Sequence, residues 1–280
     1  MIDYHVVDVF TETPFGGNQL AVIPDATALK EDQLQKIARE FNFSEVAYVY
    51  PPEDASHTAK VRLFTPTTEI PFAGHPTIGT AVVLAHLGKG PEMTLELGVG
   101  PLDCHATDTE ARFTTRVPFE VLGRPETGIV ARALGLPIGS IRSQRHMPMI
   151  CSLGLPFVVT EVQDRKALAA CSIDIATFKA GVSAYPQSGD FAQYVYCQGD
   201  GCVHARMFAP LDIVPEDPAT GSAAATLAGL TAHLDGEPVD LHIQQGEDMG
   251  RPSRIHAYAD QGRVTVTGSV VRVMQGQLLV

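Results

Sequence analysis

The chain has 280 residues, of which 45% are hydrophobic and 19% are charged. This composition suits one large or two smaller globular domains and excludes a disordered chain. Thirty-two Asp and Glu residues against 20 Lys and Arg residues give a formal net charge of −12. Such a charge repels phosphate backbones and anionic membrane surfaces, so we expect no nucleic-acid or membrane partner.

The first ten residues, MIDYHVVDVF, lack the basic and apolar regions of a signal peptide. The chain also contains no apolar run of the length that spans a bilayer. Its five cysteines are scattered and form no C-x-x-C pair. We therefore expect a cytoplasmic protein whose thiols are reduced.

The first half of the chain carries the patterns of short strands and two helices. In residues 31–41, apolar side chains recur at i, i+3, i+4 and i+7, which predicts an amphipathic helix. Residues 75–87 are typical of a buried helix that ends at Gly88. Strands are expected at 2–10, 20–23, 47–50 and 60–65, with three more within 93–116.

The segment 118–125 is rich in Pro and Gly, and we place a domain boundary there. Beyond it, the patterns predict helices at 127–134 and 218–234. Mixed strands with one long helix in each half favour an α+β fold. The strands are expected at 157–162, 192–196, 203–208, 241–245, 254–258, 263–267 and 271–273.

The two halves resemble each other at one place. VRLFTP ends at Pro66 and ARMFAP ends at Pro210, 144 residues later. HPTIGTA begins at His75 and DPATGSA begins at Asp217, 142 residues later. Chance could produce either match, because Pro, Gly and Ala are common. Two matches in the same order favour an internal duplication.

Each copy of the repeat predicts a strand, a loop and a helix. We expect Pro76 and Pro218 at the first helical position, with His75 and Asp217 at the caps. A helix N-terminus presents unpaired N–H groups and a positive partial charge, so two such ends could hold a small carboxylate. The alternative is a pair of ordinary packing helices with small residues for close contact, in which Asp217 is only a cap.

Glu45 follows a polar turn and begins an apolar strand. A carboxylate there is partly desolvated, which suits proton transfer. Taken singly, Glu45 could be a solvated surface residue and His75 a structural one. The convergence of Glu45, His75, Asp217 and Ser222 with glycine-containing loops favours a catalytic role. The sequence lacks nucleotide-binding loops, a nucleophile elbow and zinc-ligand spacing, so we predict no metal and no organic cofactor.

At these residues the chain resembles the phenazine-biosynthesis PhzF-like isomerase family. The resemblance implies a diaminopimelate-epimerase-like fold of two pseudo-symmetric α+β domains, each a β-barrel-like mixed sheet around a central helix. It implies a first domain of residues 1–118 plus a strand at about 270–280, a second of 125–268, an active-site cleft between them and a cofactor-free homodimer. The matching stretches are DVFTETPFGGNQLAVI, IAREFNFSEVAYV, VRLFTPTTEIPFAGHPTIGTA, ARMFAPLDIVPEDPATGSAAATLA and QGEDMGRPSRI.

The resemblance also implies roles for individual residues. Glu45 is similar to the family's general acid/base, and His75 and Asp217 resemble its supporting catalytic residues. The implied activity moves a proton within a small cyclic or unsaturated amino-acid-like carboxylate, as in the isomerisation of trans-2,3-dihydro-3-hydroxyanthranilate. The candidate substrate-binding residues are Asn18, Gly74, Gly221 and Ser222.

Two alternatives stay open at this point. The first is an amino-acid epimerase or racemase. Related racemases and epimerases carry a cysteine at each helix N-terminus, and here His75 and Asp217 stand in those places, which disfavours two-thiol chemistry. The second is a small-molecule-binding protein of the same fold without catalytic activity. Hydrogen exchange into a bound ligand would separate an enzyme from a binding protein.

Overall fold

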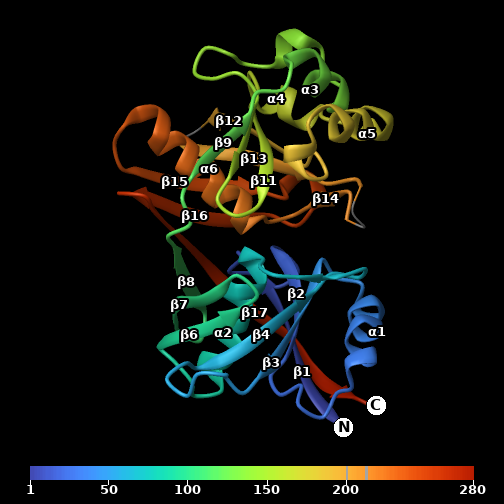
Figure 1. Ribbon diagram of the computed structural model, residues 1–280, viewed down its shortest axis with the longest axis vertical. Coiled ribbons are helices and arrows are strands. Elements are labelled where there is room, and N and C mark those ends of the chain that lie inside the picture. The colour runs from blue at the N-terminus through green and yellow to red at the C-terminus, as the bar shows by residue number, and fades with distance from the viewer. Residues whose placement is uncertain (200, 212–213) are drawn as a thin grey trace. The chain divides into compact units, whose positions relative to one another are not determined.

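The computed structural model describes residues 1–199, 201–211 and 214–280. The chain divides into two compact units, which Figure 1 shows by colour along the chain. Unit 1 contains Met1–Thr115 and Thr265–Val280, and unit 2 contains Arg116–Val264. Positions 212 and 213, within one of the stretches that resemble the PhzF-like family, lie outside the described residues.

Unit 1 is a closed ring of strands. Its strands pair in the order β1, β2, β3, β4, β6, β7, β8 and β17, and β17 pairs with β1 to complete the ring. Closure leaves no unpaired sheet edge. The bounds are β1 Ile2–Val9, β2 Asn18–Ile23, β3 Glu45–Tyr50, β4 Ala59–Phe64, β5 Glu69–Ile70, β6 Glu92–Leu97, β7 Gly100–Ala106, β8 Glu110–Thr115 and β17 Arg263–Leu278.

Helix α2 (Gly74–His86) lies inside this ring and packs against β1, β2, β3, β7 and β8. Every residue from Gly74 to Leu84 is buried, as expected for a helix that is apolar on all sides. A Cβ at Gly79 would lie 2.6 Å from the Leu20 side chain and 2.8 Å from Val9. Glycine is therefore what allows the helix to approach β1 and β2 so closely.

Helix α1 (Glu31–Phe41) confirms the predicted amphipathic helix. Its apolar face, with Leu34, Ile37 and Ala38, packs on residues of β2 and β3. The hydroxyl of Tyr48 in β3 donates a 2.6 Å hydrogen bond to the Leu34 carbonyl. Asn42 adopts a left-handed conformation and ends the helix.

Unit 2 also has a buried central helix, α6 (Gly221–Asp235), whose residues are buried from Gly221 to Thr231 except Ser222. A cluster of apolar side chains from α3, β11, α5 and β12 forms a further core. The other bounds are β9 Glu120–Gly123, α3 Thr127–Ala133, β10 Met149–Ser152, β11 Pro156–Glu161, α4 Arg165–Ala169, α5 Ile175–Ala184, β12 Gln193–Gly199, β13 Cys202–Phe208, β14 Glu216–Asp217, β15 Val239–Gln245 and β16 Ser253–Asp260.

The strand pairing confirms the internal duplication. In unit 1, β2 and β3 are parallel, β3, β4 and β5 are successively antiparallel, and β4 and β6 are parallel. In unit 2, β11 and β12 are parallel, β12, β13 and β14 are successively antiparallel, and β13 and β15 are parallel. The central helix follows the short strand in both units, so the units share one topology.

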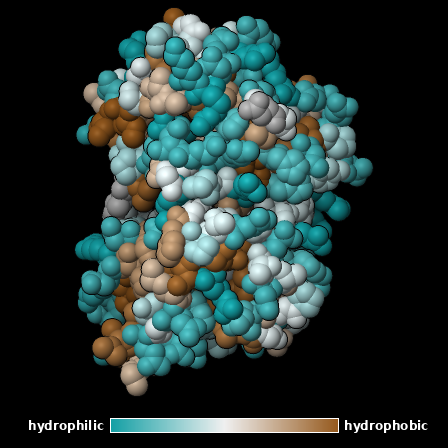
Figure 2. All heavy atoms as spheres, turned by 180° about the vertical axis from the view of Figure 1, so that it is seen from behind, coloured by the Kyte–Doolittle hydropathy of each residue, from teal (hydrophilic) through white to brown (hydrophobic). Residues whose placement is uncertain are grey.

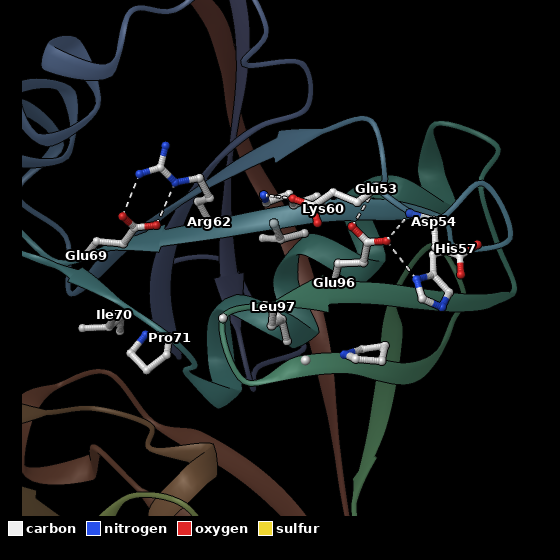
Figure 3. Close-up of a pocket in the computed structure, with 14 residues that line it drawn as sticks. Glu53, Asp54, His57, Lys60, Arg62, Glu69, Ile70, Pro71, Glu96 and Leu97 are labelled. Carbon is white, nitrogen blue, oxygen red and sulfur yellow. Dashed lines mark hydrogen bonds and ion pairs between the residues drawn. The ribbon is translucent and has the colours of Figure 1, made fainter.

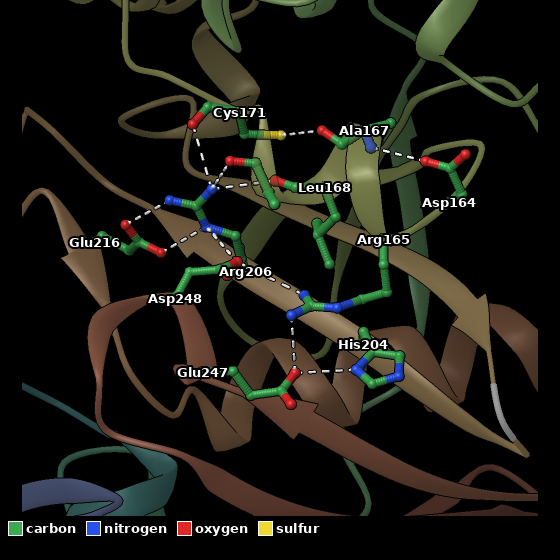
Figure 4. Close-up of polar contacts among 11 residues, drawn as sticks. Asp164, Arg165, Ala167, Leu168, Cys171, His204, Arg206, Glu216, Glu247 and Asp248 are labelled. Atoms are coloured by element: carbon green, nitrogen blue, oxygen red, sulfur yellow. Dashed lines mark hydrogen bonds and ion pairs between the residues drawn. The ribbon is translucent and has the colours of Figure 1, made fainter.

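One matched arginine makes the same contacts in each copy. Arg62 binds Glu69 through two hydrogen bonds of 2.7 and 2.6 Å (Figure 3), and Arg206 binds Glu216 through two of 2.8 and 2.9 Å (Figure 4). Each guanidinium also lies over the ring of the phenylalanine two residues further along. Arg206 additionally donates to the carbonyl of Leu168 at 3.1 Å. The duplicated sequence therefore folds into duplicated contacts.

The structure corrects the expectation of two strands at 263–267 and 271–273. They are one continuous strand, β17. Gly268 forms no turn; a Cβ there would lie 2.2 Å from the Phe10 ring, so the glycine makes room for that side chain. The Ser269 carbonyl accepts hydrogen bonds from the backbone N–H groups of Phe10 and Thr11.

The face shown in Figure 2 is mostly hydrophilic, with hydrophobic side chains in scattered groups. None of the described helices combines the length and the apolar character that a bilayer span requires. None of the five cysteines, all within the described residues, forms a disulfide, and four of them are buried.

Candidate active site

Three predicted site residues from different elements meet in unit 1. Asn18 begins β2, Glu45 begins β3, and His75 lies in the first turn of α2. Because β2 and β3 run parallel, with Leu20 opposite Glu45, the two strands begin at the same edge of the sheet. Since α2 packs on both strands, its first turn reaches this edge.

These side chains contact one another in series. The Nε2 atom of His75 lies 3.5 Å from Oε2 of Glu45. On the other side of the ring, the Nδ2 atom of Asn18 lies 3.3 Å from Nδ1 of His75. The hydroxyl of Ser44, next to Glu45 in sequence, donates a 3.4 Å hydrogen bond to Oδ1 of Asn18. The imidazole is thus held between an amide and a carboxylate.

Burial keeps the imidazole neutral. His75 is 4% exposed. Burial lowers its pKa to about 3, against the opposing effect of a backbone hydrogen bond at Gln19. Asn18 lies on the Nδ1 side of the ring, and Nε2 faces Glu45. The Glu45 side chain is 14% exposed, so it reaches solvent and can reach a small molecule.

The start of α2 suits an anionic group. Its N-cap residue is Ala73, whose methyl side chain makes no capping hydrogen bond, and Gly74 is the first helical residue. The backbone N–H groups of the first turn and the positive end of the helix dipole therefore lie beside His75. This arrangement can hold a carboxylate close to Glu45.

Two expectations about this helix were wrong. His75 is the second helical residue rather than the cap, and Pro76 is the third rather than the first. The first four N–H groups of a helix have no partner within the helix, so a proline at the third position removes no intrahelical hydrogen bond. Local sequence therefore could not fix where the helix begins.

Asp217, Gly221 and Ser222 lie in unit 2. Asp217 ends β14, is 8% exposed, and accepts a 2.5 Å hydrogen bond from the Thr220 hydroxyl. The Gln245 amide donates to the Asp217 carbonyl at 2.8 Å and to the Thr220 hydroxyl at 3.0 Å. Gly221 is the first residue of α6, and half-buried Ser222 is the second.

The structure also corrects the start of the second helix. The cap of α6 is Thr220 rather than Asp217, and Pro218 lies outside the helix. The backbone N–H of Thr220 donates to Oε1 of Gln245, and the Pro218 carbonyl accepts from the Ser253 hydroxyl. The Pro218 carbonyl, which a helix that began at Pro218 would use, is bound by a side chain instead, and α6 begins at Gly221.

Sequence reasoning missed several residues that contact the predicted site residues or lie next to them. Ser44 appeared only as part of a turn, and Gln245 and Ser253 only as parts of a loop that resembles the family. Tyr194, whose hydroxyl donates a 3.4 Å hydrogen bond to Gln245, carried no signal at all. Burial raises the pKa of the Tyr194 hydroxyl well above its usual range. For Gln245, the available signal was its position at the start of that loop, just before Gly-Glu-Asp.

A separate cavity of about 800 Å³ opens in unit 1, and Figure 3 shows the side chains that line it. Its charged groups bind one another. Glu96 accepts a 2.9 Å hydrogen bond from His57 and two of 2.8 Å from the backbone N–H groups of Glu53 and Asp54. The cavity lining includes none of the predicted site residues.

Known proteins resemble this chain over its full length. The profile of the PhzC-PhzF family, described as phenazine biosynthesis-like protein, matches residues 7–276. An uncharacterized isomerase of Mesorhizobium japonicum is 36% identical over 303 residues, covering 99% of each chain. The trans-2,3-dihydro-3-hydroxyanthranilate isomerase of Pseudomonas fluorescens is 32% identical over 296 residues, covering 100% of each.

Solved structures also resemble this chain. A predicted epimerase from Pseudomonas aeruginosa superposes with a TM-score of 0.84 at 31% identity, covering 100% of both chains. A probable proline racemase from Agrobacterium radiobacter superposes with a TM-score of 0.60 at 16% identity, covering 99% of this chain and 93% of the other. The second likeness is one of fold alone.

Proposed function

Because the chain belongs to the PhzC-PhzF family of phenazine biosynthesis-like proteins and is an isomerase with the diaminopimelate-epimerase-like fold, we propose that it moves a proton within a small amino-acid-like carboxylate. The observation that supports this most is the group of Asn18, Glu45 and His75 in unit 1, which places a carboxylate beside a buried neutral imidazole.

In the proposed reaction, Glu45 removes a proton from a carbon of the substrate, and the electron pair of the broken C–H bond shifts into the adjacent unsaturated system. Glu45 then returns the proton to a different carbon, so the product is an isomer and no oxidant or reductant is needed. One positioned acid/base contributes about 10²–10⁴-fold to the rate.

His75 has a positioning role in this scheme. Its Nε2 atom lies 3.5 Å from Oε2 of Glu45, while Asn18 contacts the other side of the ring. Because the imidazole is neutral, it places no full positive charge beside the Glu45 carboxylate. The uncapped start of α2 holds the substrate carboxylate and stabilises the negative charge that develops.

Asp217, Gly221 and Ser222 stay predicted contributors to the same reaction. The family resemblance supports them, and so does the first turn of α6, which no side chain of its N-cap residue caps. We further propose that the enzyme works in the cytoplasm as a homodimer. An Asp217→Asn variant tests the proposed role of Asp217, and it should lose activity while it remains folded.

We take trans-2,3-dihydro-3-hydroxyanthranilate as the first substrate to test, because a 32% identical relative is named for its isomerisation. The reaction is followed by proton NMR in D₂O. Turnover with deuterium incorporated at a new carbon would support the proposal. Tight binding without any exchange would instead indicate a binding protein and contradict it.

Glu45→Gln is the decisive variant. We expect its turnover to fall at least about 100-fold, because the amide cannot accept the proton, while substrate affinity changes little. Glu40→Gln, at an exposed position of α1, is the matched control and should keep wild-type activity. If Glu45→Gln kept more than about a tenth of the activity, Glu45 would not be the acid/base.

Epimerisation is the second candidate, because a relative of known structure is named as a predicted epimerase. It would exchange deuterium at one retained carbon and invert that centre. Two-thiol epimerisation is disfavoured because neither α2 nor α6 contains a cysteine. The position of the deuterium in the product distinguishes the two reactions.

A further inference from the structure

Three metal-ligating side chains gather on the exposed face of the β15–β16 pair in unit 2. Asp240 and His242 are two residues apart on β15, so their side chains point to the same face. His256 lies directly opposite His242 on antiparallel β16. Asp240 and His242 are exposed, and His256 is partly exposed.

The donor atoms converge on one point. Oδ1 of Asp240 lies 2.6 Å from Nε2 of His256 and 3.9 Å from Nε2 of His242. One donor atom from each residue lies within 4.8 Å of the others. Ligands around a tetrahedral zinc ion are about 3.3 Å apart when the bonds are about 2.0–2.1 Å long. Small side-chain rotations would bring the three atoms to that spacing.

The two imidazoles lie next to each other, and rotation of at least one ring would turn both nitrogens toward one ion. Their rings are stacked, with centroids 4.8 Å apart and planes 12° apart. The opposite face of the hairpin is fixed, because buried Leu241, Ile243, Ile255 and Ala257 pack toward the core and α6 packs on both strands. The backbone that carries the ligands is therefore rigid, which reduces the ordering cost of binding an ion.

We propose that Asp240, His242 and His256 bind a divalent transition-metal ion such as Zn²⁺, with coordination positions left for water. Two imidazoles and one carboxylate suit Zn²⁺, Ni²⁺ or Cu²⁺ and exclude a preference for Mg²⁺ or Ca²⁺, which take oxygen ligands. The formal net charge of −12 adds a general attraction for cations. The ion would tie β15 to β16, and β15 also carries Gln245 of the Asp217 group.

The three residues belong to unit 2 and Glu45 belongs to unit 1, so the proposal uses none of the residues of the proposed isomerase chemistry in unit 1. The sequence did not reveal it, because Asp240 and His242 are separated from His256 by a loop. Only the register of the β15–β16 pair brings His256 opposite His242.

Zinc binding to the full chain, prepared without a polyhistidine tag and stripped with a chelator, tests the proposal by isothermal titration calorimetry. We expect one Zn²⁺ per chain, with affinity reduced at least about tenfold in His256→Ala and in Asp240→Asn. His105→Ala is the matched control, because His105 also pairs with a carboxylate, Glu92, at 2.7 Å. Its affinity should stay within about twofold of wild type.

Thermal unfolding gives a second readout. Zn²⁺ should raise the unfolding midpoint of the wild type and of His105→Ala, but not that of His256→Ala, because a ligand that binds only the folded state stabilises it. Absence of saturable binding up to about 1 mM Zn²⁺, or equal affinities in wild type and His256→Ala, would overturn the proposal.

Discussion

At the scale of single residues, the main feature of this protein is a histidine kept neutral beside a carboxylate. His75 has a folded-state pKa of about 3, whereas an imidazole in an unfolded chain has one of about 6.5. The unfolded state therefore binds the proton first as the pH falls. The stability that neutral His75 contributes at pH 7 is lost progressively from about pH 6.5 downward.

This difference predicts a pH dependence of unfolding. Between pH 6.5 and 4, His75 should lower the free energy of unfolding by up to about 1.4 kcal/mol per pH unit. Urea unfolding of His75→Asn at several pH values should show a shallower decline than the wild type, whatever its stability at pH 7. His233→Asn, at an exposed position, should decline as the wild type does. Parallel curves for His75→Asn and wild type would contradict a buried neutral imidazole.

Thiol reactivity is a second property of individual residues. Burial raises the pKa of Cys104, Cys151 and Cys171 to about 12 and that of Cys197 to about 11, so these thiols are protonated and shielded at pH 7. Cys202 is partly exposed at the start of β13. Its Sγ atom lies 3.6 Å from Nε2 of His204, and Nδ1 of His204 lies 3.0 Å from Glu247 (Figure 4 shows the latter pair).

We expect one fast-reacting thiol per folded chain when the protein is titrated with a chromogenic disulfide reagent at pH 7. Cys202→Ser should abolish this fast phase, whereas Cys104→Ser should leave it unchanged. The other four thiols should react only after unfolding. A fast phase that survives in Cys202→Ser would show that a buried cysteine becomes accessible in the native protein.

At the scale of elements, α2 depends on close contact with the strands that surround it. Gly79→Ala would place a methyl group 2.6 Å from Leu20 and 2.8 Å from Val9, well inside van der Waals contact. We expect a loss of about 1–3 kcal/mol in the free energy of unfolding, because overpacking outweighs the better helix propensity of alanine. Urea unfolding measures this loss.

Gly139→Ala provides the control for this substitution. A Cβ at Gly139 meets nothing within 4 Å, so the same chemical change should alter stability by less than about 0.5 kcal/mol. If the two variants were equally stable, the packing of α2 against β1 and β2 would be looser than the structure shows.

At the scale of the whole molecule, two copies of one strand–helix unit carry different polar groups. Unit 1 places Glu45 and His75 at its helix, and unit 2 places Asp217 and Thr220 at the corresponding one. Divergence after duplication therefore changed the side chains while the strand pairing was retained. The pairs Arg62–Glu69 and Arg206–Glu216 are side-chain contacts that both units retain.

At the same scale, we predict that the protein is a dimer. We expect sedimentation velocity to show a species of about twice the chain mass at micromolar concentration, as the family resemblance implies. The mass should not change when a chelator is added, because the proposed metal site lies within one chain. A single species of the chain mass across the accessible concentrations would contradict the dimer.

The sequence by itself predicted the α+β class, the duplication and helix α1 over its full length, because these features follow from local periodicity and from motifs that are contiguous in the chain. The isomerase activity followed from the resemblance to the PhzF-like family. Glu45 and His75 were singled out from a strand start and a repeat, and the structure brings their side chains together, while their catalytic roles stay predictions. The short elements α4, β9 and β10 gave patterns too brief to stand out.

Tertiary structure alone decided the starts of α2 and α6, the continuity of β17 and the partners of each site residue. Gln245 binds the backbone of Thr220, the N-cap of α6, from 25 residues away, and the Phe10 ring occupies the space that a side chain at position 268 would need. Asp240, His242 and His256 meet only through strand register. Each of these features rests on contacts between residues distant in sequence, and such contacts leave no pattern in the segments that form them.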